Sequence, residues 1–157
     1  MIRIGKMTDY GVVLLSIFAR GPKKSALTAR LLSHTSQLPL PTVSKLLKAL
    51  CKSGVLVSQR GVNGGYCLSR SPDKISFAEV IEILEGPIAI TECSAPKVRH
   101  CGRDPNCPVR SNWNEVTRTI REALKKLTLA DIAQSQVWPV DSKPEEGTLR
   151  DERQGSL

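Results

Sequence analysis

The stretch that decides the fold is residues 41–68, PTVSKLLKALCKSGVLVSQRGVNGGYCL. Its first half predicts a helix that begins at Pro41, because a proline suits the first helical turn, where its missing N–H would have no partner. One apolar stripe follows at helical spacing: Val43, Leu46, Leu47 and Leu50. The opposite side carries the lysines: Lys45, Lys48 and Lys52. The segment is therefore expected to bury one face and to expose a basic one.

The second half of the stretch predicts a two-stranded hairpin. Residues 55–60 and 66–69 are the expected strands, and Gly61 to Gly65 form a turn that needs positive φ. Arg60 stands at the tip of this hairpin. There it can reach phosphates or insert into a narrowed minor groove of DNA.

Two more helices are expected upstream. Residues 10–19 are apolar all round, as in a buried helix, with Thr8 as its N-cap and Asp9 in its first turn. Residues 27–35 predict a short second helix, and residues 36–40 the turn that follows it. Three helices followed by a hairpin are the order of a winged helix-turn-helix, whose third helix enters the major groove.

Downstream, residues 76–84 predict a fourth helix with Ser76 as its N-cap. Residues 109–127 predict a long helix, and Thr128 begins a last short one that ends near Gln134. The long helix has an apolar stripe at three-four spacing: Trp113, Val116, Ile120, Ala123 and Leu127. Because little chain is left to cover this stripe, we expect a second copy of the chain to do so, in a homodimer.

The expected fold class is mainly α, with a two-stranded wing. The chain is expected to divide into a winged helix-turn-helix DNA-binding domain (1–85), a cysteine loop (86–108), a dimerisation helix with a terminal short helix (109–134) and a disordered tail (135–157).

Charge favours a duplex nucleic acid as the partner. The chain of 157 residues carries a formal net charge of +8, and its first 85 residues hold 12 Lys and Arg against 5 Asp and Glu. Aromatic residues are only 4% of the chain, too few for the stacking platforms that bind single strands. A lysine-lined helix face is usually only a solvated one, but the adjoining wing makes DNA contact the better interpretation. The expected contacts are Thr42, Ser44, Lys45, Lys48 and Arg60.

Catalysis and membrane insertion are not expected. His34 and His100 fall in unrelated places, and neither a phosphate-binding Gly-Lys-Ser/Thr loop nor a His-Glu-x-x-His helix is present. The sequence therefore predicts no enzyme and no small-molecule substrate. The apolar run from Gly11 to Ala19 is too short to span a bilayer and lacks a signal-peptide cleavage site. A cytoplasmic protein is expected.

Three cysteines in the irregular loop suggest a metal centre. Cys93, Cys101 and Cys107 have the spacing C-x7-C-x5-C. Zinc ribbons usually present two Cys-x2-Cys knuckles, which this loop lacks, so the spacing favours an iron-sulfur cluster over zinc and leaves incidental thiols as the third alternative. Cys51 and Cys67 lie beside predicted apolar positions and are expected to be packing residues.

The sequence resembles the Rrf family of bacterial winged-helix regulators, to which IscR and NsrR belong, and is most similar to regulators of iron-sulfur assembly. The resemblance rests on the wing (60–68), the Thr8-Asp9-Tyr10 opening, the Pro41–Leu50 helix, residues 77–81, the cysteine loop and residues 127–132. It implies a homodimer and a 2Fe-2S or 4Fe-4S cluster in the loop. The family's three ligand positions map onto Cys93, Cys101 and Cys107.

One position departs from the IscR-like branch. That branch has a histidine three residues after the third cysteine, where this chain has Arg110. A fourth ligand would come from Asp9 of the other subunit, as in nitric-oxide-sensing relatives, from His100 or from solvent. The resemblance thus implies a repressor of iron-sulfur assembly genes that senses through a cluster. A nitric-oxide- or redox-responsive regulator of the same family and a zinc-stabilised DNA-binding protein are the alternatives.

Overall fold

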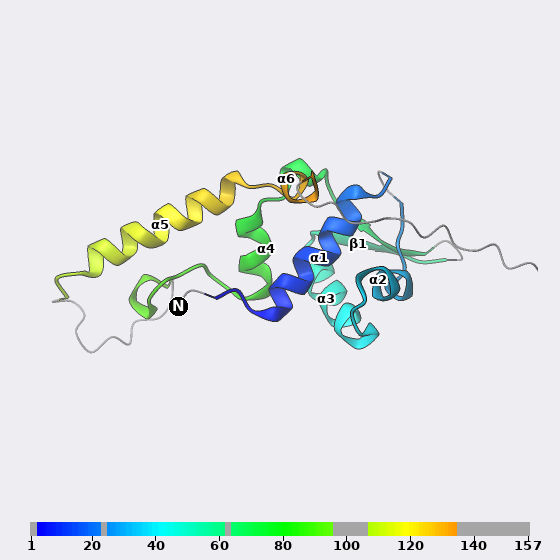
Figure 1. Ribbon diagram of the computed structural model, residues 1–157, viewed down its shortest axis with the longest axis horizontal. Coiled ribbons are helices and arrows are strands. Elements are labelled where there is room, and N and C mark those ends of the chain that lie inside the picture. The colour runs from blue at the N-terminus through cyan, green and yellow to red at the C-terminus, as the bar shows by residue number, and fades with distance from the viewer. Residues whose placement is uncertain (1–2, 23–24, 62–63, 96–106, 135–157) are drawn as a thin grey trace, which may run out of the picture.

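The computed structural model describes residues 3–22, 25–61, 64–95 and 107–134. Within these residues it contains six α-helices and one two-stranded antiparallel sheet (Figure 1). The elements are α1 (Lys6–Arg20), α2 (Ala29–Ser36), α3 (Leu40–Lys52), β1 (Leu56–Gln59), β2 (Gly65–Leu68), the 3-10 turn η1 (Pro72–Lys74), α4 (Phe77–Leu84), the 3-10 turn η2 (Glu92–Ser94), α5 (Arg110–Lys126) and α6 (Leu129–Gln134). The predicted fold class, mainly α with a winged helix-turn-helix, is confirmed. The predicted disordered tail, 135–157, lies outside the described residues.

The core lies among α1, α2, α3, the start of β1, α4 and α6. The predicted apolar stripe of α3 is confirmed, because Val43, Leu46, Leu47 and Leu50 are all at most 1% exposed. They pack with Leu14 and Leu15 of α1, which are fully buried. The purely apolar middle of α1 is therefore surrounded on several sides, as its sequence predicts.

The wing is confirmed with slightly different strand bounds, and it has an additional bridge that the sequence does not predict. β1 and β2 pair from Leu56 opposite Leu68 to Gln59 opposite Gly65. Leu27 joins them, because its N–H donates to the Tyr66 oxygen at 2.8 Å and its own oxygen accepts from the Tyr66 N–H at 2.9 Å. The prediction that α2 begins at Leu27 is therefore wrong. Thr28 is the N-cap instead, and its hydroxyl accepts from the Leu31 N–H.

The predicted cap of α1 is also wrong. The helix begins at Lys6 with Gly5 as its N-cap, and Thr8 lies inside the first turn with no exposed surface. A threonine enclosed by the core cannot also mark the solvated start of the helix. The predicted caps of α4 and α6 are confirmed. The Ser76 hydroxyl accepts from the Glu79 N–H, and the Thr128 hydroxyl accepts from the Asp131 N–H.

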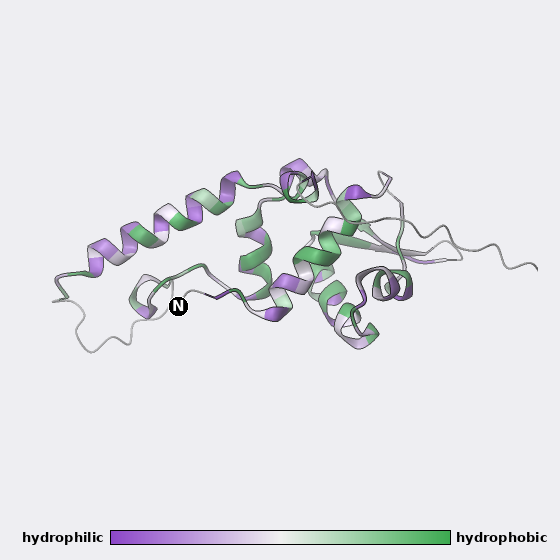
Figure 2. Cartoon of the chain, viewed as in Figure 1, coloured by the Kyte–Doolittle hydropathy of each residue, from purple (hydrophilic) through white to green (hydrophobic). Residues whose placement is uncertain are grey.

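The C-terminal helices divide between the core and an outlying position. α6 returns to the core, where the Leu129 N–H donates to the Ile75 oxygen and Arg20 Nε donates to the Ala133 oxygen. The long α5 extends away from the helices of the core, with η2 beside it (Figure 1). Figure 2 shows hydrophobic and hydrophilic residues alternating along α5, in contrast to the mainly hydrophobic α4. Among the described residues of α5, only Thr117 is buried.

Candidate functional site

A tight turn fixes α3 against α2. Gln37 adopts a left-handed conformation with φ of 56°, and its side-chain amide donates to the His34 oxygen at 2.8 Å. Ser33 donates to the Leu38 oxygen at 2.6 Å on the other side of the turn. These hydrogen bonds satisfy backbone oxygens at the end of α2 and hold the helix-turn-helix rigid.

The predicted DNA contacts of α3 lie on the surface opposite its buried stripe. Lys45 and Lys48 are exposed, while Thr42 and Ser44 are half-buried. All four belong to the first two and a half turns of the helix, the part from which side chains of a recognition helix reach base edges and phosphates. The structure thus leaves these side chains free of the core.

The wing places Arg60 at the end of β1. Its side chain is exposed, and Gly61 beside it has φ of 116°, as the predicted turn requires. The wing is tied to the recognition helix, because the Val55 N–H donates to the Leu50 oxygen at 3.1 Å. Arg60 and the lysines of α3 are therefore carried by directly connected, mutually packed elements.

Two of the three predicted cluster ligands fall within the described residues. Cys93 belongs to η2, and Cys107 lies just before α5, with its oxygen accepting from the Arg110 N–H. Both are free, half-buried thiols. Cys101 and His100 lie outside the described residues. Among the described residues alone, no three His, Cys, Asp or Glu side chains gather into a metal site.

The remaining cysteines and Asp9 have other surroundings. Cys67 is 4% exposed, and burial together with the nearby Cys67 thiol raises the pKa of Cys51. A raised pKa disfavours the thiolate form that binds metals, so packing against the core is the role that fits Cys51. Burial alone gives Cys67 the same role. Asp9 is exposed in the first turn of α1, where its carboxylate is favourably placed near the positive helix end.

Hydroxyl groups around Cys93 form a network that the sequence interpretation missed. The Thr91 hydroxyl lies 3.2 Å from the Cys93 sulfur and 3.1 Å from the Ser94 hydroxyl. Thr117 of α5 donates to the Ser94 hydroxyl at 3.0 Å and accepts from the Ile90 N–H at 3.3 Å. The local signal was a Thr two residues before Cys93 and a Ser directly after it. Nothing local indicated Thr117.

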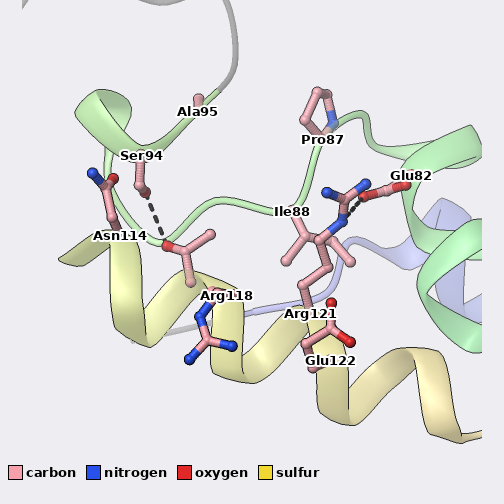
Figure 3. Close-up of a pocket in the computed structure, with 10 residues that line it drawn as sticks. Glu82, Pro87, Ile88, Ser94, Ala95, Asn114, Arg118, Arg121 and Glu122 are labelled. Carbon is pink, nitrogen blue, oxygen red and sulfur yellow. Dashed lines mark hydrogen bonds and ion pairs between the residues drawn. The ribbon is translucent and has the colours of Figure 1, made fainter. Parts of the chain in front are cut away.

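A pocket of about 370 Å³ lies between α4, η2 and α5 (Figure 3). At one end Ser94 faces α5 and accepts the hydrogen bond from Thr117. At the other end Arg121 Nε lies 2.8 Å from Glu82 Oε1. These two interactions join α5 to the rest of the chain at separate points, with the pocket between them.

Two further ion pairs join residues of α5 to each other on its surface. Arg118 pairs with Glu115, and Lys125 Nζ lies 2.8 Å from Glu122 Oε1. The hydrogen bonds from these cations lower the pKa of both Glu115 and Glu122. Such exposed pairs one turn apart support the helix only weakly. They do not cover the apolar stripe, of which Trp113 and Val116 remain 40% exposed.

Residues 4–135 match the sequence profile of the Rrf2 family, described as an iron-dependent transcriptional regulator. The chain belongs to the Rrf2 family. It is 26% identical to the transcriptional regulator CymR of Bacillus subtilis over 132 residues, which cover 84% of this chain and 90% of CymR. It is 24% identical to NsrR of Shouchella clausii over 131 residues, 83% of this chain and 88% of NsrR.

Two solved structures share the fold. The structure of CymR, the global cysteine regulator of B. subtilis, matches with a TM-score of 0.72 at 26% identity, covering 87% of this Rrf2 protein and 99% of CymR. The structure of T. potens IscR matches with a TM-score of 0.65 at 25% identity, covering 85% and 87%. The family consists of transcription regulators, which confirms the predicted regulator and the prediction that the chain is not an enzyme. In the described residues no helix is long and apolar enough to cross a membrane.

Proposed function

We propose that this Rrf2 protein is a homodimeric repressor of iron-sulfur assembly genes that acts in the cytoplasm and senses through an iron-sulfur cluster. Residues 1–85 would bind double-stranded DNA, residues 86–108 would hold the cluster, and residues 109–134 would join the subunits. The observation that carries this proposal is the attachment of the cysteine loop to α5. Cys93 lies in a turn hydrogen-bonded to Thr117, and Cys107 lies three residues before the helix begins.

The donor set suits an iron-sulfur cluster. Cys93 and Cys107 are free, half-buried thiols at the two ends of the segment that also contains Cys101. Thiolates are the ligands that such clusters prefer, and a hydroxyl beside the Cys93 sulfur can donate to the thiolate form. We propose Cys93, Cys101 and Cys107 as ligands. The bound cluster would supply a redox-active centre that oxidants can damage.

DNA would be bound through α3 and the wing. We propose that Lys45, Lys48 and Arg60 contact phosphates or the minor groove, and that Thr42 and Ser44 reach base edges. Lys45 and Lys48 are exposed on the side of α3 opposite its buried stripe, and Arg60 is exposed at the end of β1, which supports their assignment. Thr42 and Ser44 are half-buried in the first turns of α3, the part of a recognition helix that lies closest to base edges.

Sensing would operate by linkage between the loop and the spacing of the two recognition helices. A ligand changes DNA affinity only as far as it binds the two arrangements of a dimer differently. Since the loop is hydrogen-bonded to α5, a cluster bound there would bias how the α5 helices of a dimer pack. The two DNA-binding domains would then change their separation.

The proposal is tested by anaerobic isolation of the full chain, with analysis of iron, sulfide and zinc and an absorption spectrum. The loaded and the cluster-free protein are then titrated with the same promoter duplex at one salt concentration. We expect iron and sulfide together, and DNA affinities that differ at least about fivefold, the lower end of ordinary allosteric coupling. Equal affinities would remove the sensing role. Stoichiometric zinc without sulfide would replace the cluster by a structural metal.

Substitution of the cysteines identifies the ligands. Cys93→Ala, Cys101→Ala and Cys107→Ala should each lose the cluster spectrum, because three thiolates leave no spare donor. Cys51→Ser is the matched control and should keep it, since Cys51 lies at the end of α3. A protein lacking all three loop cysteines that still assembles a full cluster would refute the site.

A further inference from the structure

We propose that Thr91, Ser94 and Thr117 form a hydroxyl relay, in which Thr91 donates a hydrogen bond to the Cys93 sulfur while Ser94 and Thr117 fix the turn that carries Thr91 and Cys93 relative to α5. This inference rests on the proposed function, in which Cys93 is a cluster ligand. It assigns to Thr91 and Thr117 a positioning role that no spacing of cysteines reveals.

Proton counting determines where the Thr91 hydroxyl points. A hydroxyl group has one proton and two lone pairs. The Ser94 hydroxyl donates its proton to the Thr91 backbone oxygen at 2.8 Å. Its two lone pairs accept from the Thr117 hydroxyl at 3.0 Å and from the Thr91 N–H at 3.1 Å. The Thr91 hydroxyl, 3.1 Å away, is a third donor facing these two lone pairs. Because Ser94 cannot accept from all three donors at once, the Thr91 proton can turn to another acceptor.

The remaining neighbour of the Thr91 hydroxyl is the Cys93 sulfur, 3.2 Å away. A thiolate has no proton to give, so in the ligand form of Cys93 the hydroxyl must be the donor. This hydrogen bond therefore runs from the Thr91 hydroxyl to the sulfur. Hydrogen bonds to ligand sulfurs stabilise the negative charge on a cluster and are one of the terms that set its reduction potential.

The relay is anchored on α5 and not on the loop alone. Thr117 is 8% exposed and is the buried residue of an otherwise exposed or half-buried helix within the described part of α5. Its hydroxyl holds both ends of the short segment, through Ser94 and through the Ile90 N–H. A shift of α5 would therefore displace the Thr91 hydroxyl that donates to Cys93. A change in the position of Cys93 would in turn displace α5.

The test compares Thr91→Val, which keeps the side-chain shape without the hydroxyl, with Thr91→Ser, which keeps the hydroxyl. Thr117→Val interrupts the relay on α5. Its matched control is Thr119→Val on the same helix, whose hydroxyl bonds only within the helix, to the Glu115 oxygen at 2.9 Å. All are full-length proteins, loaded anaerobically with iron and sulfide.

Two readouts are measured on the loaded protein: the reduction potential and the rate of cluster loss to an iron chelator. Thr91→Val should lower the potential, because the donor that stabilised the added electron is gone. It should also lose the cluster about tenfold faster, the lower end of the effect of removing a partner of a metal ligand. Thr91→Ser should retain the wild-type values, which a merely structural role for the methyl group would not give.

A third readout needs no cluster. In the cluster-free protein, hydrogen exchange at the Ile90 amide should be faster in Thr117→Val than in wild type or Thr119→Val, because its acceptor is removed. Unchanged exchange would overturn the anchoring on α5. If wild type loads but Thr91→Val keeps its potential and cluster lifetime, the relay is refuted and the cluster function stands. If wild type takes up no iron and sulfide, the proposed function fails, and the relay's role at a cluster fails with it.

Discussion

Lys48 is proposed to contribute to DNA affinity through a phosphate contact, without reading the base sequence. Its side chain is exposed on the third turn of α3, at a position from which a lysine can reach phosphate oxygens. We expect Lys48→Ala to weaken binding to operator and random duplexes alike. The slope of log affinity against log salt should become shallower by about one unit, as one released counterion is lost. Titrations at four salt concentrations measure both effects.

The matched control for Lys48 is Lys52→Ala. Lys52 is the last residue of the same helix and is also exposed, so the change in net charge is identical. The C-terminal end of a recognition helix points away from the groove. The salt slope of the Lys52→Ala protein should therefore stay close to that of wild type. If both variants lower the slope equally, the effect is one of overall charge, and Lys48 makes no particular contact.

Individual residues also show the reach of sequence reasoning. The candidate ligands in the loop and the basic side of α3 can be inferred from the spacing of residues that are close in the sequence. The partner of Ser94 does not, because Thr117 lies 23 positions further along and the two meet only through the placement of α5. The N-cap of α1 was predicted wrongly for a related reason. Threonine is a residue type that favours N-caps, but Thr8 is buried inside the first turn of the helix.

Among the elements, the wing depends on a close approach of two backbones. A Cβ at Gly65 would lie 2.8 Å from the Leu27 oxygen and 2.9 Å from its carbonyl carbon. These are backbone atoms, which cannot rotate away. Only a residue without a side chain allows the pair of hydrogen bonds between Leu27 and Tyr66.

We therefore expect Gly65→Ala to lower the free energy of unfolding by about 1–3 kcal/mol, the cost of straining or breaking those two hydrogen bonds. Urea denaturation measures it. The comparison is Gly54→Ala, where φ is +79° but no atom lies within 4 Å, so backbone strain alone acts and costs about 1–2 kcal/mol. A Gly65→Ala protein as stable as wild type would mean that Leu27 is not held against the wing.

The elements were predicted well where neighbouring residues determine them. The predicted α4 and α6 agree with the structure because their caps, Ser76 and Thr128, act within three residues. The start of α2 was predicted wrongly, because the backbone of Leu27 is hydrogen-bonded to Tyr66, a strand residue far along the chain. Helical periodicity cannot reveal such competition between local and distant backbone partners.

Among the described residues, α5 is joined to the rest of its own chain at η2 and at α4. Thr117 contacts η2, and Arg121 contacts α4 through Glu82. The apolar stripe lies on another side, where Trp113 and Val116 are each 40% exposed and Leu127 is 47% exposed. Exposed apolar side chains aligned along one helix are typical of an interface. The predicted homodimer would bury this stripe between two α5 helices.

The last prediction places a charge on that stripe. Val116→Glu should raise the dimer dissociation constant at least about tenfold, because an unpaired carboxylate would be buried between the helices. The isolated subunit should stay folded, with an unchanged circular dichroism spectrum, since the side chain of Val116 is not part of the core. Sedimentation equilibrium over a range of protein concentrations measures the association.

Ser111→Glu is the matched control, because it adds the same charge in the exposed first turn of α5, about half a turn around the helix from Val116. It should leave association unchanged. Weaker association should also weaken binding to a duplex with two half-sites more than binding to one half-site, since only a dimer engages both. Association of Val116→Glu as tight as that of wild type would move the subunit interface away from this side of α5, and the coupling proposed between loop and DNA would need another route.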